Sequence, residues 1–396
     1  MTERTPPVLR VATVFMTYPV ASETFAQRDV KALQRLGHSV EIHQLNPRTD
    51  GALDKLKSMA SNVKALLGFP APGQLIGLFF RLLFSRHWRL VDRLKCICLL
   101  PAAAHVAKRI IASQPDVVHL FWGHYPSLVT LLVEGHLPRG RLSMFLGAYD
   151  LEMKLPVSRW AHATSDLLFT HAQVNVADIQ SFLGRSAQPR VIHRGIDLQP
   201  YPVDAYVGFA ERRAQIFTAG RLIADKGFDR VIRVFAQVHA SCPEARLAIA
   251  GTGPELTALQ QLTRSLGLEN AVSFLGWLDE QQVREQLASS RVFVLLSTKL
   301  GERLPNAVKE GMAAGCVCIS SDSPGIDELL EDGRSGFILD VGSEARIAQT
   351  VLIALRDDAM SMGRAAVAKV RNSFDVEVSA KKYLALWQDE GNETHE

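Results

Sequence analysis

Residues 292–315 read VFVLLSTKLGERLPNAVKEGMAAG and combine three local signals in one short stretch. The apolar run over residues 292–296 predicts a buried strand. Pro305 is typical of a helix start, and Gly315 follows the helix-forming residues as a typical helix end. Strand, loop and helix in this order form the repeating unit of a parallel α/β sheet, so the stretch predicts that fold class.

Two glutamates, Glu302 and Glu310, lie on either side of the predicted helix start. The backbone amides of residues 304–307 would point between them, and such a helix start attracts anions. The two carboxylates would repel a phosphate, but they can accept hydrogen bonds from hydroxyl groups on either side of it. A diphosphate with a sugar at each end has this layout, so the stretch predicts a site for a sugar nucleotide.

The rest of the chain repeats the alternation of strand and helix patterns in two long runs. This alternation predicts parallel sheets covered by helices on both faces, and two runs predict two doubly wound, Rossmann-like α/β domains. We place these domains at residues 1–200 and 214–372. Residues 201–213 lack a clear period and separate them.

The composition narrows the class of protein. A length of 396 residues predicts two to three domains, and 47% hydrophobic with 21% charged residues is ordinary for a soluble globular chain. We find no signal-peptide pattern, and we expect the five cysteines to be buried thiols of a cytoplasmic protein rather than disulfides or metal ligands. Zinc spacings, a Walker loop and Ser-His-Asp or Cys-His triads are not found, so we expect no metal, no cofactor and no nucleic-acid partner.

The net charge of +3 hides an asymmetry between the two halves of the chain. Residues 1–200 hold 23 Lys and Arg against 14 Asp and Glu, whereas residues 201–396 hold 21 against 27. A basic half suits an anionic substrate or an anionic membrane surface.

Within the basic half, residues 75–95 combine an apolar run with several arginines. The run is shorter than the about 20 residues that a membrane span needs. The segment is predicted to be either a buried helix or a helix that lies on the membrane interface. The second interpretation predicts peripheral association with the inner face of the plasma membrane.

A second candidate anion-binding loop follows the strand that ends at Ala219. Gly220 lets a ligand approach the backbone. Arg221 and Lys226 follow at the carboxyl end of the strand, where open α/β sheets bind ligands, and both side chains suit phosphate contact. The alternative is a solvated turn in which Asp225 pairs with Lys226.

Two further strand ends are weaker candidates for contact with the ligand. Gly251 and Gly253 precede Pro254 in a pattern that resembles the dinucleotide-binding fingerprint but lacks its third glycine. We therefore interpret them as a tight strand-to-helix turn near the ligand. Trp277 follows Gly276 and could lie beside a base; the alternative is an ordinary, partly buried tryptophan.

In the first half, candidate acceptor-binding residues follow predicted strands. Ser22, Glu23 and Thr24 come after the first strand, where a hydroxyl could cap the next helix or an acceptor group could bind at that helix start. His124 and Asp150 follow later strands. For each of them, the alternative to a role in acceptor binding is a purely structural role.

Taken together, these motifs resemble the retaining glycosyltransferases of family 4. The resemblance is dense over residues 190–345, and in the first half it is looser and closest to members that build bacterial surface polysaccharides. The motifs that carry it are Gly195-Ile196-Asp197, Gly220-Arg221 with Lys226-Gly227, Gly251-Thr252-Gly253-Pro254 and the pair Glu302 and Glu310.

The resemblance implies two Rossmann-like domains that face each other across a cleft (the GT-B fold). It also implies a final helix, within residues 373–396, that returns to the first domain. Reactions of this family are thought to proceed by front-face attack, in which the leaving phosphate takes the acceptor proton. The cations and the helix dipole then neutralise the leaving diphosphate without a metal ion.

The resemblance also implies roles for individual residues. Arg221 and Lys226 would bind the donor diphosphate, Glu302 would contact the donor sugar, and Glu310 would hold the ribose hydroxyls. The amides near Leu304, Pro305 and Asn306 would contact sugar and phosphate.

Three positions depart from the family pattern. Leu146 stands where relatives often carry a histidine, Arg303 where a glycine often follows the first glutamate, and Phe121 where a polar residue is common. If the backbone at Arg303 required a positive φ, that arginine would be strained.

We therefore expect a transferase that moves a hexose from a UDP- or GDP-sugar to a glycan or lipid-linked acceptor. The first alternative is a nucleotide-sugar-binding partner protein without transferase activity, which Leu146 and Arg303 motivate. The second is a nucleotide-sugar epimerase of the same fold.

Overall fold

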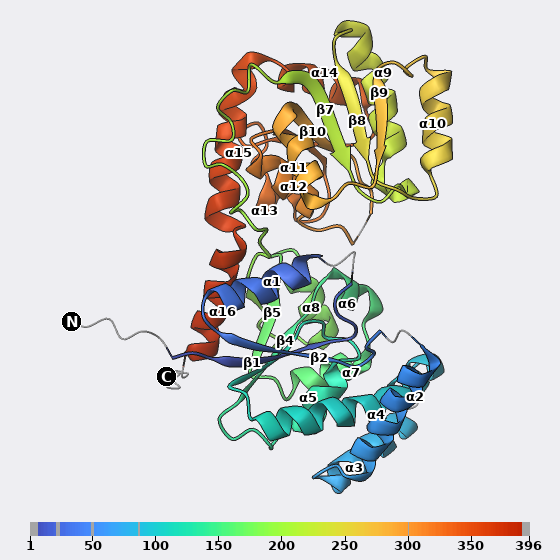
Figure 1. Ribbon diagram of the computed structural model, residues 1–396, viewed down its shortest axis with the longest axis vertical. Helices are drawn as coiled ribbons and strands as arrows, with labels where there is room; N and C mark the ends of the chain where they lie inside the picture. Colours follow the sequence, from blue (N-terminus) through green and yellow to red (C-terminus); the bar gives the residue numbers. More distant parts are fainter. Residues whose placement is uncertain (1–6, 21–23, 49–50, 86–87, 300, 390–396) are drawn as a thin grey trace, which may run out of the picture. The chain divides into compact units, whose positions relative to one another are not determined.

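The computed structural model describes residues 7–20, 24–48, 51–85, 88–299 and 301–389. The chain divides into two compact units, which we call unit 1 (Met1–Arg194 with Ser379–Glu396) and unit 2 (Gly195–Val378). Each unit is built on one parallel six-stranded sheet with helices between the strands (Figure 1). The predicted α/β class with two doubly wound sheets is confirmed.

The sheet of unit 1 has the strand order β2-β1-β3-β4-β5-β6. Its inner strands are apolar almost throughout, which is typical of parallel strands that are covered on both faces. The strands are β1 (Arg10–Phe15), β2 (Ser39–Gln44), β3 (Val117–Leu120), β4 (Arg141–Phe145), β5 (Leu167–Thr170) and β6 (Arg190–Val191).

The helices of unit 1 supply most of its core. Among the described residues before 194 they are α1 (Thr24–Arg35), α2 (Ala52–Leu67), α3 (Pro72–Phe84), α4 (Leu90–Ser113), α5 (Ser127–Val133), α6 (Ala148–Met153), α7 (Pro156–His162) and α8 (Asn175–Leu183).

The last helix, α16 (Val376–Gln388), passes from unit 2 into unit 1 at Ser379. Trp387 is buried, and its indole Nε1 donates a hydrogen bond to the Ser143 hydroxyl at 3.2 Å. The Trp387 ring also lies 5.3 Å from the ring of His119, centroid to centroid. The final helix is therefore anchored on β3 and β4 of unit 1.

The sheet of unit 2 has the order β12-β11-β10-β7-β8-β9. Its strands are β7 (Arg213–Ala219), β8 (Arg246–Ala250), β9 (Val272–Gly276), β10 (Ser290–Leu295), β11 (Val317–Ser321) and β12 (Phe337–Leu339). Its helices are α9 (Phe228–Ser241), α10 (Leu256–Ser265), α11 (Glu280–Ser289), α12 (Asn306–Ala313), α13 (Ile326–Leu329), α14 (Glu344–Ala354) and α15 (Met360–Ser373), and a 3-10 turn covers Ala224–Lys226.

Residues 75–95 do not form the single helix that the sequence analysis expected. Helix α3 ends at Phe84 and α4 begins at Leu90. Trp88, between them, is buried and packs against Trp160 in a tilted arrangement, with ring centroids 4.6 Å apart. Burying this indole requires the chain to turn, so a tertiary contact divides the apolar segment.

One helix of the described chain, α4, is long and apolar enough to cross a membrane, and α2 and α3 meet the same test only as a pair bent by 111°. Helix α4 contributes Cys96, Leu100 and Ile110 to the core of unit 1. We therefore interpret α4 as a core helix.

Candidate functional site

The strand order of unit 2 reverses between β7 and β10. From β7 the chain adds β8 and β9 on one side and β10 to β12 on the other, and β7 and β10 pair in parallel. Figure 1 shows these two strands side by side. Their carboxyl ends share one edge of the sheet, and this reversal point is where doubly wound sheets bind ligands. The predicted donor-site loops that begin at Gly220 and Ser297 both start at this edge.

Close backbone contacts hold the loop after β7 against the loop after β8. The amide of Leu222 donates to the carbonyl of Thr252 at 3.0 Å. A Cβ atom at Gly251 would lie 1.8 Å from the carbonyl oxygen of Gly220, and one at Gly253 would lie 2.2 Å from that of Leu222. Both glycines are therefore needed for the approach of two protein backbones, a role that the sequence analysis did not foresee.

Hydrogen bonds also join the loop after β7 to the loop after β10. The carbonyl of Asp225 accepts from the amide of Thr298 at 2.8 Å and from the hydroxyl of Ser297 at 3.1 Å. The hydroxyl of Ser321, at the end of β11, donates to the carbonyl of Ser297 at 2.6 Å. Three neighbouring strand ends are thus fastened into one rim.

Lys226 and Glu302 form an ion pair across this rim. The Lys226 Nζ donates to the Glu302 Oε1, and the two side chains are only 18% and 12% exposed. The alternative pairing of Lys226 with Asp225 is not found among the described residues. The second oxygen of Glu302, Oε2, is buried and has no hydrogen-bond partner in the described part of the chain. The carboxylate therefore retains one acceptor atom whose hydrogen-bonding capacity is unused.

Arg221 differs from Lys226 in its surroundings. Its side chain is exposed, and it makes no ion pair within the described residues. Arg221 is therefore an available cation at the carboxyl end of β7.

The start of α12 has an unusual backbone. Leu304 is buried and has φ +51°, a left-handed conformation that costs a non-glycine residue about 1–3 kcal/mol. Pro305 follows as the extended residue that caps the helix, so α12 begins at Asn306, one residue later than the sequence predicted. Arg303 lies outside the left-handed region, so its replacement of the family glycine causes no backbone strain.

The first amides of α12 point out of the helix. The carbonyl of Pro305 accepts from the amides of Val308 and Lys309, at 3.1 and 3.3 Å. The amides of Asn306 and Ala307 donate no hydrogen bond within the described residues, so they are free to bind an anion.

Lys309 is a residue that sequence reasoning missed. It is only 1% exposed, its Nζ donates to the Asn306 Oδ1 at 3.1 Å, and it lies 5.5 Å from the ring of Phe374. A lysine beside Glu310 reads as a solvated helix face, so no sequence signal could have revealed its burial. Its hydrogen bond orients the Asn306 side chain at the helix start.

Two other predicted donor-site residues lie on the surface or near it. Glu310 is half-buried within α12. Trp277 is 73% exposed, so the alternative of a partly buried tryptophan is wrong, and its ring is accessible for stacking. Contact of either residue with a donor stays a prediction.

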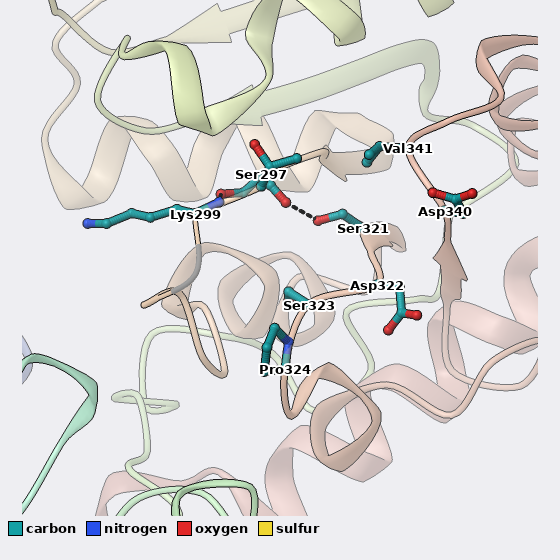
Figure 2. A pocket seen from close by; sticks show the side chains of 9 residues that line it. Ser297, Lys299, Ser321, Asp322, Ser323, Pro324, Asp340 and Val341 are labelled. Atoms are coloured by element: carbon teal, nitrogen blue, oxygen red, sulfur yellow. Dashed lines mark hydrogen bonds between the residues drawn. The ribbon is translucent and has the colours of Figure 1, made fainter. Parts of the chain in front are cut away.

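Two cavities open beside the rim and share Thr298. One, of about 360 Å³, includes Asp225, Asp229 and Glu255 in its lining. The other, of about 190 Å³, lies where β10, β11 and β12 end, and Figure 2 shows Ser297 and Ser321 facing each other in it while Lys299 extends away. Neither cavity is lined by the predicted phosphate-binding residues, which lie on the open rim.

The candidate acceptor residues follow strands of unit 1, and β1 and β3 flank its own point of strand-order reversal. Ser22 and Glu23 lie outside the described residues, and Thr24 is the first residue of α1. His124 is buried, and its Nδ1 accepts a hydrogen bond from the Tyr125 amide at 2.8 Å. Burial lowers the pKa of His124 to about 4, so the ring is neutral at pH 7.

Asp150 is fully enclosed at the start of α6. Its Oδ2 accepts a hydrogen bond from the amide of Gly147 at 2.9 Å. Burial raises the pKa of Asp150 to about 7, although that amide and the nearby Arg194 lower it. Asp150 therefore has a structural role at the helix start, and its contact with an acceptor stays a prediction.

Two of the departures from the family pattern have packing reasons. Leu146 is completely buried, and it fills the space that a Cβ on Gly123 would occupy, 2.3 Å from its methyl carbon. Phe121 belongs to a set of aromatic rings whose centroids lie between 4.4 and 5.4 Å from the guanidinium carbon of Arg194: Phe25, Phe121, Trp122 and Phe145. Both substitutions place apolar side chains where this chain packs its own core.

Comparisons with known proteins agree with this geometry. Residues 204–370 match the family described as Glycosyl transferases group 1. The amylovoran biosynthesis glycosyltransferase AmsK of Erwinia amylovora is 25% identical, and the match covers 94% of this chain and 97% of that protein. The N-acetyl-alpha-D-glucosaminyl L-malate synthase of Bacillus anthracis is 32% identical over 161 residues, 40% of this chain and 41% of that protein.

The crystal structure of HepE from Anabaena in complex with UDP-glucose shares the fold. Its TM-score is 0.66 at 18% identity, and the match covers 96% of this chain and 99% of that chain. The family match covers residues 204–370 of unit 2, so this part of the chain is similar to the group 1 glycosyltransferases. Over nearly the whole length, the likeness to HepE shows the same α/β fold.

Proposed function

We propose that the protein is a retaining, metal-independent hexosyltransferase. It moves a hexose from a UDP- or GDP-sugar to a glycan or lipid-linked glycan during the synthesis of a bacterial polysaccharide or glycolipid. The observation that carries this proposal is the convergence of Arg221, Lys226 and two free helix amides at the reversal point of the unit 2 sheet.

The relatives support both ends of the proposed reaction. HepE is solved with UDP-glucose, which supports a nucleotide-sugar donor. AmsK is named for amylovoran biosynthesis, which supports a polysaccharide product. Both matches extend over nearly the whole chain, so the support concerns both units.

The residues at the rim suit the departure of a nucleoside diphosphate. When the bond between the anomeric carbon and the phosphate oxygen breaks, that oxygen takes the electron pair. Arg221, Lys226 and the amides of Asn306 and Ala307 would stabilise the resulting charge in a preorganised site. The acceptor hydroxyl forms the new bond to the same carbon, and its proton passes to the leaving phosphate.

The two glutamates would orient the hydroxyl groups of the donor. Glu302, whose Oε2 has no partner among the described residues, would accept a hydrogen bond from the hexose once the donor exposes that oxygen. Glu310, one helical turn after Asn306, would accept from the ribose. Because Glu302 also pairs with Lys226, sugar contact and diphosphate contact are coupled through one ion pair.

A donor screen tests the proposal. Thermal shift is measured with UDP, GDP, ADP and TDP, alone and as common sugar conjugates, and ligand at 100 times its dissociation constant adds about 2.7 kcal/mol of stability. We expect one base to stabilise the protein, one of its sugars to stabilise it further, and that donor to release its nucleotide when a glycan acceptor is added. No shift and no release with any donor would refute the proposal.

The same experiment separates the alternatives. Binding without nucleotide release in any acceptor pool would favour a binding protein, and conversion of the sugar without acceptor would favour an epimerase. Nuclear magnetic resonance of the product tests retention, because the anomeric configuration of the donor should persist in the new linkage.

A further inference from the structure

Helix α3 of unit 1 carries two apolar stripes. Leu75, Leu78 and Leu82 are buried in the core of the unit. Ile76, Phe79, Phe80 and Leu83 follow the i, i+3, i+4, i+7 spacing of a second helical face, and each is more than a third exposed. A helix that needs only one apolar face for folding thus presents another to its surroundings.

The neighbouring helices repeat this feature. Helices α2 and α3 both pack on α4 at one flank of unit 1 (Figure 1). Twelve of the twenty exposed large apolar side chains in the described chain fall between residues 56 and 94, so they concentrate on this flank. In addition to the four α3 residues named above, they are Leu56, Met59, Val63 and Leu67 on α2, Phe84 as the last residue of α3, and Leu90, Val91 and Leu94 at the start of α4.

The exposed aromatic side chains are ordered against one another. Phe80 and Phe84 stack with ring centroids 6.0 Å apart, and Phe79 meets Phe80 edge-on at 5.6 Å. Isolated surface apolar residues need no explanation, but twelve on three helices that pack together are typical of an interaction surface.

The positive charge of the same segment indicates which kind of partner the apolar surface fits. Residues 51–95 hold eight Lys and Arg against two Asp, a net charge of +6. Lys55 and Lys64 are exposed on α2, and Arg89 and Lys95 are exposed at the start of α4. Apolar stripes bordered by cations complement an anionic lipid surface, where chains accept the apolar groups and headgroups accept the charges.

We propose that α2, α3 and the first turns of α4 form a peripheral membrane anchor that inserts these side chains into the interface of an anionic bilayer. The helices lie in the interface rather than crossing it, because α2 and α3 are bent by 111° and the buried stripes of α3 and α4 belong to the protein core. The anchor does not rest on the proposed transfer reaction, since it uses no residue of the unit 2 rim.

Vesicle flotation with the full-length protein tests the anchor. Vesicles of phosphatidylglycerol and phosphatidylcholine are compared with vesicles of phosphatidylcholine alone, at low and high salt. We expect the protein to float with the anionic vesicles at low salt and to bind more weakly at high salt, because salt screens the headgroup attraction.

A double variant and a matched control locate the contact. Phe80→Ser with Leu83→Ser should lower the partition onto anionic vesicles at least about tenfold, since two large apolar side chains no longer leave water. Ile353→Ser with Met360→Ser replaces two exposed apolar residues of unit 2 and should float like the wild type. Circular dichroism and the thermal shift with a donor check that both variants fold.

Three outcomes would overturn the proposal. The wild-type protein could remain in the bottom fraction of the gradient with both vesicle compositions. The Phe80 and Leu83 double variant could float as well as the wild type. Alternatively, light scattering could show a wild-type dimer that this variant converts to a monomer, without vesicle binding by either; the face would then be an interface between copies of the chain.

Discussion

At the scale of single residues, the two cations of the rim are not equivalent. Lys226 is held by Glu302 and is largely buried, whereas Arg221 is exposed and makes no ion pair within the described chain. A donor diphosphate would therefore share Lys226 with a carboxylate but would gain the full interaction with Arg221. Arg221 is the more informative position for substitution.

We expect Arg221→Ala to weaken binding of the UDP- or GDP-sugar by roughly 10- to 150-fold, because charge-assisted hydrogen bonds contribute about 1.5–3 kcal/mol. Isothermal titration calorimetry measures the dissociation constant. Arg264→Ala, an exposed arginine on α10, is the matched control and should leave the constant unchanged. Equal affinities for the wild type and Arg221→Ala would remove Arg221 from the donor site.

Asp150 is a second residue whose environment has a measurable consequence. Its pKa is about 7 in the folded chain, against about 3.9 for an unfolded aspartate. Between these values the unfolded chain has released the proton while the folded chain still holds it. The contribution of Asp150 to the free energy of unfolding is therefore fully present below pH 4 and is lost as the pH rises to about 7.

Asp150→Asn removes this titration but keeps an oxygen that can accept from the Gly147 amide. We expect the variant to gain stability relative to the wild type as the pH rises from 4 to 7, measured by denaturant unfolding at each pH. Asp54→Asn, at an exposed position of α2, should show no such trend. A constant difference between Asp150→Asn and the wild type across this pH range would contradict the assignment.

At the scale of elements, the site depends on helices and loops that are secured by contacts far from the rim. Lys309 inside α12 holds Asn306 at the start of that helix, and the glycines after β8 allow the loop after β7 to approach. Helix α16 is secured in the same way, because Trp387 packs on His119 and bonds to Ser143.

We expect Trp387→Ala to destabilise unit 1 by roughly 3–5 kcal/mol, because truncating a buried aromatic side chain leaves a cavity. Hydrogen exchange should accelerate in β3 and β4, with no change in β7 and β8 of unit 2. Lys382→Ala, an exposed substitution on the same helix, serves as the control. Unchanged exchange in β3 and β4 would show that α16 is not anchored through this residue.

At the scale of the whole molecule, the two halves of the chain carry different charge. The first 200 residues have a net charge of +9 and the remainder −6, and residues 51–95 alone have a net charge of +6. Unit 2 is acidic overall but concentrates Arg221 and Lys226 at one edge of its sheet. Local placement of charge, rather than net charge, is therefore what the proposed binding of an anionic donor to unit 2 relies on.

We expect transferase activity to persist in EDTA and to change by less than about twofold on addition of Mg²⁺, because Arg221, Lys226 and the α12 amides supply the positive charge that a metal ion would provide. Nucleotide release in the presence of acceptor is the measurement. Activity that disappears in EDTA and returns with Mg²⁺ would contradict metal independence.

Much of the fold was predictable, because strand and helix periods, prolines and glycines act over a few residues. The stretch 292–315 forms the strand, loop and helix that its pattern predicts, with the helix start displaced by one residue. The positions of Arg221, Lys226 and Glu302 at neighbouring strand ends also followed from the alternation of elements. Their roles toward a donor, and those of the candidate acceptor residues, stay predictions.

By itself, the sequence determined the α/β class, the two runs of alternating elements and the resemblance to a glycosyltransferase family, because these depend on local patterns and on motif order. Only the tertiary structure decided that Lys226 pairs with Glu302, 76 positions away, that Lys309 is buried, and that Trp88 divides the apolar segment before α4. Each of these depends on contacts between residues distant in the chain, whose burial and pairing no local pattern specifies.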